Sequence, residues 1–417
     1  MPTKGNRPYD IVIFGATGVV GYYAIRDLYQ SVQQISEEYA SVRWAVAGRR
    51  MDKLQQTLAE LSEELQVDLS AVPKIIADVL DLPSIETMVK STKVLLNCVG
   101  PYNHYGRAVV DACINARTDH FDLSAELQFI EGTQLDCHEA ALNADVIVVS
   151  ACGFCSIIPE MGLALARQHF NGTLHSVESY IDFKPGKQVF VDMVGNRVNL
   201  LDHFAFQGYS INFGSFHSIM YFFVNILDMV PIRRRLREQY STAALPKSRI
   251  GHWQWLLRFP FSSNAKGISV VLPIPDLSAA HRTNQYNYQH HGDRPILYSA
   301  YYRLRMWKVI FGWPIVFLFW CGCGRALLKR NIDCLTNGVI SKNGPSREQV
   351  SEARFSLRVI AKGWSEKCDS TELEPKGKRD KKMIIKISGG DPPYAVTASA
   401  LVQVGLTALI DRKMMPR

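Results

Sequence analysis

Short apolar runs alternate with segments of helical periodicity over the first 150 residues of the chain. The runs predict six β-strands, at residues 10–14, 42–47, 73–77, 93–98, 120–123 and 145–150. Leu54, Leu58, Leu61 and Leu65 repeat at 4-3-4 spacing, which predicts a helix over 51–65 with one apolar face and with Asp52 as its N-cap. Strands and helices in this alternation predict an α/β fold with an N-terminal, doubly wound parallel sheet and right-handed crossovers.

The pattern changes after residue 172. Residues 185–300 are aromatic, rich in turns and poorly periodic, and regular alternation returns only at 354–361. Strands are also expected at 174–184 and 383–387, and an apolar closing helix at 394–410. We therefore predict an N-terminal domain over 1–172, an inserted α+β domain with an antiparallel sheet over 173–394, and a closing C-terminal helix over 395–417.

One apolar segment interrupts the second half of the chain. Val309 to Gly324 holds no charge for 16 residues, and it lies between cations at Arg303, Arg305 and Lys308 and at Arg325, Lys329 and Arg330. A membrane-spanning helix needs about 20 apolar residues, and Pro314 disfavours one straight helix. Trp and cations at both ends favour a segment that enters one leaflet and returns. A buried core helix and a true span are the alternatives.

The first predicted strand runs directly into a glycine-rich turn, Gly15-Ala16-Thr17-Gly18-Val19-Val20-Gly21, and then into a helix. Such a turn directs backbone N–H groups and the positive end of a helix dipole at a dinucleotide phosphate. Gly15 would allow the tight turn, Gly18 the approach of the pyrophosphate, and Gly21 close packing of the helix on the strand. The same turn also occurs as a simple strand–helix connection.

Three further strand ends carry residues suited to a nicotinamide dinucleotide. Arg49 and Arg50 follow the second strand, where NAD sites carry an acidic residue, and guanidinium groups suit the 2′-phosphate of NADP. Exposed arginines without a ligand are the alternative. Asp78 follows the third strand and could accept a hydrogen bond from the adenine amino group. After the fourth strand, Val99, Gly100 and Pro101 would turn the backbone past the pyrophosphate and the nicotinamide ribose.

Four residues are candidates for catalysis, and the sequence does not choose between them. Tyr102 could stack on the cofactor, bind it by a hydrogen bond, or simply lie at the rim of the crevice. Asp122 and Glu126, four residues apart after the fifth strand, could cap the next helix or act as general acid or base. Cys155 is the fourth candidate. It forms a CxxC pair with Cys152 that suits a redox or metal site, but a second ligand pair at zinc spacing is missing, which favours reduced cytosolic thiols.

The composition and charge of the chain favour some classes of binding partner over others. With 417 residues, 47% of them hydrophobic, the chain can bury a large core in two domains. The net charge of +8 is spread along the chain and favours an anionic lipid surface over nucleic acid, for which no motif is present. The polar N-terminus lacks an apolar signal region, so secretion is not expected.

These motifs together resemble the saccharopine dehydrogenase-like oxidoreductases of animals and, more distantly, bacterial trans-acting enoyl reductases. The resemblance is carried by residues 14–18, 44–49, 97–102 and 122–126, and by 171–174 with 177–179. It implies a Rossmann domain, an inserted α+β domain, a nicotinamide cofactor, and a site on lipid droplets or the cytosolic face of a membrane, where 309–324 would bind. Arg49 and Arg50 make NADP the expected cofactor rather than NAD. The bacterial relatives imply reduction of a lipid-linked substrate in glycolipid synthesis. Whether the chain forms a homo-oligomer stays open at this point.

The chain departs from the family pattern at three places. Ala125 replaces a glycine, Cys155 replaces an acid near the reactive centre, and the chain after Asp411 is shorter than the family's usual extension. Two hypotheses follow: an NADP-dependent oxidoreductase at a lipid surface, and a catalytically degenerate nucleotide-binding scaffold or sensor on lipid droplets. A soluble amino-acid dehydrogenase is a third, weaker interpretation.

Overall fold

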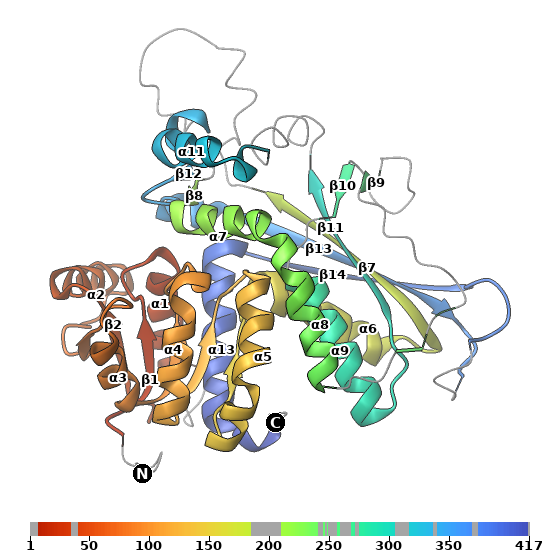
Figure 1. The fold of residues 1–417 in the computed structure, drawn as a ribbon, viewed down its shortest axis with the longest axis horizontal. Coiled ribbons are helices and arrows are strands. Elements are labelled where there is room, and N and C mark those ends of the chain that lie inside the picture. The colour runs from red at the N-terminus through yellow and green to blue at the C-terminus, as the bar shows by residue number, and fades with distance from the viewer. Residues whose placement is uncertain are drawn as a thin grey trace, which may run out of the picture.

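The N-terminal part of the chain forms a parallel six-stranded sheet, as predicted (Figure 1). The computed structural model describes residues 7–34, 41–184, 210–240, 245–246, 248, 257–258, 268–271, 275–304, 317–336, 340–368 and 374–415. The strands are β1 (Tyr9–Phe14), β2 (Trp44–Gly48), β3 (Lys74–Ile76), β4 (Thr92–Asn97), β5 (Asp119–Asp122) and β6 (Val148–Val149). Their order, β3-β2-β1-β4-β5-β6, reverses direction between β1 and β4, where dinucleotides bind in doubly wound sheets.

Helices cover both faces of this sheet because its central strands are apolar on both sides. Ile11 and Ile13 face one core and Val12 and Phe14 the other. The helices are α1 (Val19–Gln34), α2 (Met51–Leu65), α3 (Leu82–Lys90), α4 (Tyr102–Ala116), α5 (Leu127–Ala144) and α6 (Phe154–His169). The helices α1 and α2 share the first core, and α3 and α4 the second.

The helix predicted over 51–65 is α2, with one correction. Leu54, Leu58 and Leu61 are buried, as its apolar spacing predicts. Arg50, not Asp52, occupies the N-cap position with an extended backbone, and its side chain makes no capping hydrogen bond. Asp52 lies two positions further on, in the first turn, where its negative charge still interacts favourably with the positive end of the helix dipole.

The second sheet is mixed, whereas the sequence predicted an antiparallel one. Its strands are β7 (Thr173–Lys184), β9 (Leu257–Arg258), β10 (Ile268–Val270), β11 (Leu297–Leu304), β13 (Arg354–Trp364) and β14 (Lys381–Gly389), in the order β14-β13-β7-β11-β10-β9. β13 pairs antiparallel with β7 and with β14, but β11 runs parallel to β7. More than one hundred residues separate β7 from β11, so the connection is long enough for a parallel crossover.

The poorly periodic region contains helices that the sequence did not predict. They are α7 (Phe213–Val224), η3 (Ile226–Asp228), α8 (Met229–Tyr240) and α9 (Pro275–His291). α9 packs beside α6 on the second sheet, and α8 packs along α5. Further along are α11 (Gly322–Leu335), α12 (Arg347–Glu352) and a short parallel pair, β8 (Ile211–Asn212) with β12 (Ile340–Ser341).

Part of the predicted apolar insertion lies outside the described residues, namely 309–316. Its described remainder begins with a helical turn at Phe317–Trp320 and continues into α11. Phe319 is buried with Phe216 and Met220 of α7, while Phe317 and Trp320 are exposed. The described part of the insertion therefore has one packed side and one open side.

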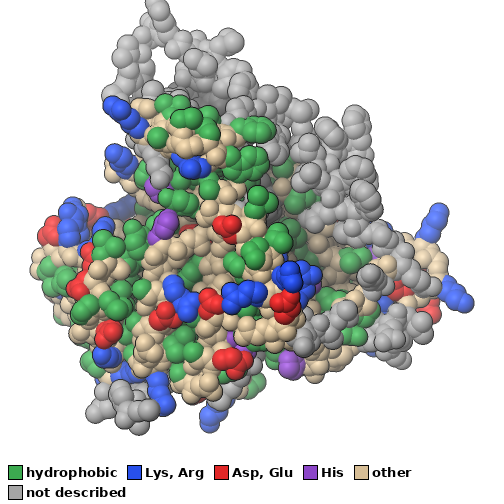
Figure 2. Space-filling view, viewed as in Figure 1, with side chains coloured by type: hydrophobic (Ala, Val, Ile, Leu, Met, Phe, Trp, Pro, Cys, Tyr) green, Lys and Arg blue, Asp and Glu red, His purple; other side chains and the backbone are tan. Residues whose placement is uncertain are grey.

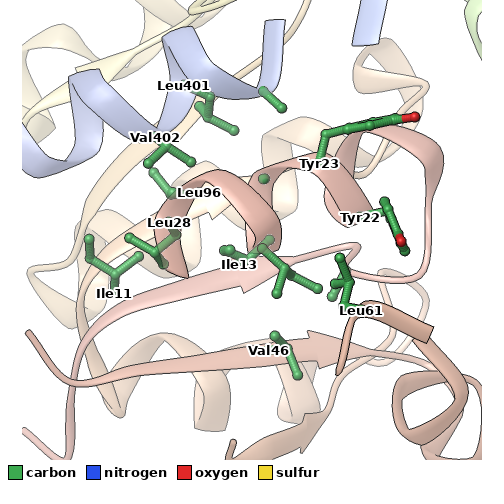
Figure 3. Packing of buried hydrophobic residues seen from close by; sticks show 14 of the residues in the cluster. Ile11, Ile13, Tyr22, Tyr23, Leu28, Val46, Leu61, Leu96, Leu401 and Val402 are labelled. Carbon is green, nitrogen blue, oxygen red and sulfur yellow. The ribbon is translucent and has the colours of Figure 1, made fainter. Parts of the chain in front are cut away.

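The C-terminal helix returns to the N-terminal sheet. A π-helical turn, η4 (Pro392–Val396), leads into α13 (Thr397–Ile410), which is followed by η5 (Arg412–Met414). Leu401 and Val402 of α13 pack with Ile11 and Leu28 (Figure 3). The stretch 392–410 is long and apolar enough to cross a membrane, but half of it is buried inside the protein. The bent pair α7 and α8 passes the same test of length and composition, with 76° between its helices.

Candidate nucleotide-binding site

The glycine turn after β1 is shaped by two positions that cannot accept a side chain. Gly15 has a φ of +86°, and a Cβ there would lie 2.8 Å from Val99 Cγ2. A Cβ on Gly21 would lie 2.3 Å from the carbonyl oxygen of Gly15, so α1 packs directly on the turn. Ala16 is buried in the core on α1's side of the sheet. This geometry agrees with the roles expected for Gly15 and Gly21.

Gly18, in contrast, lies at the open side of the turn. Thr17 and Gly18 are exposed, and a Cβ on Gly18 would meet only the carbonyl oxygen of Gly15, at 3.3 Å. Packing within the protein therefore gives little reason for a glycine here, whereas the approach of a phosphate does. α1 begins at Val19 without an acidic residue in its first turn, so no carboxylate competes for its free N–H groups. The turn fits a dinucleotide.

The ends of β2 and β3 lie beside this turn. Ala47 accepts hydrogen bonds from the backbone N–H groups of Gly15 and Ala16, and Gly48 accepts one from Ala77. Arg49 and Arg50 follow Gly48 and are exposed, and their side chains make no ion pair or hydrogen bond within the described part of the chain. Among the described residues, the Asp78 side chain accepts a hydrogen bond only from Leu80 N, at 3.1 Å through Oδ1, and its Oδ2 accepts none.

The end of β4 completes the same edge. Cys98 N donates to Phe14 O at 2.8 Å, so β4 continues alongside β1 into the turn. The side chain of Asn97 accepts from Val99 N at 3.0 Å and shapes the loop that leads to the cis bond between Gly100 and Pro101. Gly100 is exposed. Apart from Tyr102, the structure thus brings the predicted cofactor residues to one edge of the sheet.

Tyr102 is a structural residue in this geometry, which does not favour the stacking or catalytic role. Its side chain is buried, and its hydroxyl donates to Asn97 O at 2.9 Å and accepts from Leu123 N at 3.3 Å. Burial, with the charge of Asp122, raises the pKa of Tyr102 well above its usual range, so the phenol stays protonated. Tyr102 joins the ends of β4 and β5.

Hydrogen bonds also fix the carboxylates of Asp122 and Glu126. Both are fully buried, and Asp122 accepts from Ser124 N, Ala151 N and Ser150 Oγ. Glu126 occupies the N-cap position of α5 without capping it. Its oxygens instead accept from the first two N–H groups of α4, at Tyr102 (3.0 Å) and Asn103 (2.6 Å). The interpretation that these carboxylates cap the next helix is therefore wrong: no side chain caps α5, and Glu126 instead caps the preceding helix, α4.

The two departures from the family pattern in this region differ in their surroundings. Ala125 is exposed and is not among the residues with positive φ, so its methyl group causes no backbone strain. The pKa of Cys155 is raised to about 12 by burial and by the nearby charge of Asp276. Cys155 interacts with Tyr302, although the Tyr302 hydroxyl has no hydrogen bond of normal geometry. A neutral thiol of this kind is a poor acid and a poor nucleophile.

Asp276, beside Cys155, makes the stability of the protein depend on pH. It is fully buried, only its Oδ1 accepts a hydrogen bond from the residues that the structure describes, and burial raises its pKa from 3.8 to about 8. Between these values the folded protein binds more protons than the unfolded chain, so stability falls as pH rises. Asp276→Asn is expected to flatten this fall, by at most about 1.4 kcal/mol per pH unit. Urea unfolding at about pH 5 and about pH 8 measures the free energy of unfolding of the wild type and of the variant. If these two free energies differed by the same amount at both pH values, the raised pKa of Asp276 would be contradicted.

α7 is the feature of the site that sequence reasoning missed. Figure 1 shows it crossing the carboxyl ends of the strands, and Ser218 Oγ donates to Glu126 Oε1 at 2.7 Å. The ring of Tyr221 meets His104 edge-on at 4.8 Å, and Asn212 N donates to Tyr394 OH at 2.7 Å. The only signal in the sequence was the aromatic content of 213–224, which did not indicate a helix.

The chain is similar to known proteins over nearly its whole length. Residues 11–149 match the family model for the saccharopine dehydrogenase NADP binding domain. A saccharopine dehydrogenase-like oxidoreductase of Homo sapiens is 32% identical over 423 aligned residues, which cover 99% of this chain and 91% of the relative. A lipid droplet localized protein of Caenorhabditis elegans is 27% identical over 98% of this chain and 91% of its own length.

A solved structure shares the fold over nearly the whole chain. Apo saccharopine dehydrogenase (L-Glu forming) from Saccharomyces cerevisiae superposes with a TM-score of 0.51 at 12% identity, covering 98% of this chain and 92% of that one. This match extends the likeness from the nucleotide-binding sheet to the second sheet. Because the chain has the glycine turn, matches the NADP-domain model and is 32% identical to the human relative over nearly its full length, it belongs to the saccharopine dehydrogenase-like oxidoreductases and carries their NADP-binding domain.

Proposed function

We propose that this protein is an NADPH-dependent reductase that acts on a lipid-linked substrate at the surface of a lipid droplet or membrane. The observation that carries the proposal is the unpaired guanidinium pair, Arg49 and Arg50, beside an open helix N-terminus. Two adjacent cations without a carboxylate favour a ligand that carries an extra phosphate over one that carries a free 2′-hydroxyl.

Different residues of the site would bind different parts of the cofactor. The N–H groups after Gly18 would hold the pyrophosphate, Arg49 and Arg50 the 2′-phosphate, and Asp78 the adenine amino group. The loop 99–101 would then lie beside the nicotinamide ribose, at the point where strand order reverses. NADPH, when bound, supplies the hydride for reduction. The chain's own residues orient it at the edge covered by α7.

A surface of exposed apolar side chains supports the lipid location. Its members are Ile219, Leu227, Val230, Phe317, Trp320 and Leu327, and Leu227 and Trp320 expose 78% and 57% of their surface. Figure 2 shows hydrophobic side chains gathered over α7 and α11, with Lys and Arg beside them. Exposed arginines flank these residues in the sequence, at Arg234, Arg235 and Arg330. Apolar groups with cations beside them suit an interface with anionic lipid.

The cofactor is tested by removing the two guanidinium groups. Arg49→Ala/Arg50→Ala is expected to weaken NADPH binding by about 100-fold and to leave NADH binding unchanged, because each charged hydrogen bond contributes roughly 1.5–3 kcal/mol. Arg43→Ala, at the opposite end of β2 and paired with Asp10, is the matched control. Fluorescence titration with NADPH and with NADH measures the affinity of the wild type and of each variant. Equal affinity of the wild type for NADPH and NADH would overturn the assignment.

The lipid surface is tested by flotation with anionic vesicles. Phe317→Ser/Trp320→Ser is expected to reduce the floated fraction several-fold, because two exposed apolar side chains contribute roughly 1.5–3 kcal/mol each when buried. Ile384→Ser, on β14 and 55% exposed, is the control and should float like the wild type. Unchanged flotation of the double variant would show that these residues do not contact lipid.

The second candidate function, a nucleotide-binding scaffold or sensor, is favoured by a specific observation. Tyr102, Asp122 and Glu126 are held by structural hydrogen bonds, and Cys155 is a partly buried, neutral thiol. None of these four candidates is therefore free to transfer a proton. Oxidation of NADPH by the purified protein with a neutral-lipid extract, lost in Arg49→Ala/Arg50→Ala, decides for the reductase. Tight NADPH binding without oxidation decides for the scaffold.

A further inference from the structure

A cavity lies at the far edge of the N-terminal sheet, away from the glycine turn. It has a volume of about 470 Å³ and is bounded by α5, by β6 and the residues around it, and by Arg282 of α9 and Arg412. β6 is the edge strand, separated from β1 by β4 and β5. The volume is typical of a site for one small molecule, between about 300 and 1,000 Å³.

Arg282 lines this cavity without a partner. Its guanidinium makes no hydrogen bond or ion pair within the part of the chain that the structure describes, and its Nη2 is buried. Burial lowers the pKa of Arg282 from its usual value, and the charge of Glu131 partly offsets this effect. Both oxygens of Glu131 are already bonded, to Arg233 Nε and Nη2 at 2.9 Å and to Ser278 Oγ at 2.9 Å. Arg282 is partly buried, and its buried Nη2 has no hydrogen-bond acceptor, which favours an anion beside it.

The other arginine of the cavity, Arg412, already forms ion pairs. Arg412 contacts the carboxylates of Asp119 and Asp145, the latter at 3.4 Å. One positive charge, that of Arg282, is therefore left uncompensated in the lining. Much of the remaining lining is apolar, from Ile130, Cys137, Ala141, Leu142, Val146 and Val148.

We propose that this cavity binds a monocarboxylic acid with an unbranched apolar chain, its carboxylate on Arg282 and its chain along α5 and β6. A carboxylate matches the two parallel donors of a guanidinium, and its single charge neutralises the single unpaired cation. A phosphate dianion would instead leave excess negative charge near Asp145. An uncharged lipid would leave Arg282 unpaired. The site is independent of NADPH, since it shares none of the residues proposed to hold the cofactor.

The probe is octanoate, titrated into the full-length protein by calorimetry and followed by thermal denaturation. Octanamide has the same chain without the charge, acetate has the charge without the chain, and inorganic phosphate tests a simple anion site. Octanoate is expected to bind and to raise the melting temperature, and the other three to bind at least tenfold more weakly. Arg282→Gln should weaken octanoate binding at least tenfold, and Arg282→Lys should weaken it less.

Two features of the variants separate binding from folding. Ligand-free Arg282→Gln is expected to melt no lower than the wild type, because it removes an unpaired charge that is partly buried. Ala141→Phe, which fills the cavity beside α5 and keeps Arg282, should also lose octanoate. Arg234→Gln, an exposed arginine paired with Glu238 on α8, is the control and should bind normally. The proposal is overturned if octanoate does not bind, if octanamide or phosphate binds as tightly, or if both Arg282→Gln and Ala141→Phe bind like the wild type.

Discussion

Gly21→Ala is expected to abolish measurable NADPH binding and to destabilise the protein by about 1–3 kcal/mol. The added methyl group would lie 2.3 Å from Gly15 O and 2.8 Å from Ala16 Cα, both of them backbone atoms that cannot rotate away. α1 must therefore move off the turn, and the N–H groups that would face the phosphates move with it. Urea unfolding and NADPH titration measure the two effects.

Gly18→Ala is the matched control, because the same methyl group there meets only one atom, at 3.3 Å. Its stability is expected to stay within about 0.5 kcal/mol of the wild type, as at other exposed positions. NADPH affinity should nevertheless fall at least tenfold, since the methyl group occupies the approach of the phosphate. Normal NADPH binding by Gly18→Ala would show that the phosphates bind elsewhere, and a fully stable Gly21→Ala would contradict the close packing of α1.

The parts of the fold that could be predicted from the sequence are those with local signals. The strands of the N-terminal sheet are short apolar runs, and the turn after β1 depends on glycines within seven residues. The leucine spacing of α2 reports burial on one face, which the structure confirms at Leu54, Leu58 and Leu61. Capping at Asp52 was wrong by two positions, because Asp and Glu are also common in the first turn, where they favour the dipole without capping.

The rest depended on contacts between distant segments. Strand direction in the second sheet follows from how β11 crosses over to pair with β7, and no local pattern encodes it. The roles of polar residues are equally non-local: Glu126 binds the N–H of Tyr102, 24 residues away, and the hydroxyl of Ser218, 92 residues away. Spacing alone placed Glu126 near the crevice but could not show that its oxygens were already bonded.

α7 links the two surfaces on which the proposed function depends. On one side, Ser218 bonds Glu126 at the nucleotide edge. On the other, Phe216 and Met220 pack with Phe319 next to the apolar insertion, and Trp320 Nε1 donates to Phe223 O at 2.9 Å. Glu126 is therefore the residue at which the α4 loop and α7 are joined, and a change there should alter both.

Glu126→Gln is expected to destabilise the protein by about 2–4 kcal/mol, although it conserves the shape of the side chain. The carboxylate accepts three hydrogen bonds in a fully buried position, two from α4 N–H groups and one from Ser218. An amide has one acceptor oxygen, so at least one N–H of α4 loses its partner, and the favourable charge at the helix N-terminus is lost.

Ser218→Ala separates the two parts of this effect, because it removes only the contact with α7. It is expected to cost about 1 kcal/mol, with α4 still capped, and to speed hydrogen exchange in α7 while α4 exchanges normally. In Glu126→Gln both helices should exchange faster, and the loop 99–101 should loosen, which weakens NADPH binding. A Glu126→Gln protein as stable as Ser218→Ala would mean that the carboxylate does not cap α4. Equal exchange in α7 of Ser218→Ala and the wild type would mean that α7 is held by its apolar packing alone.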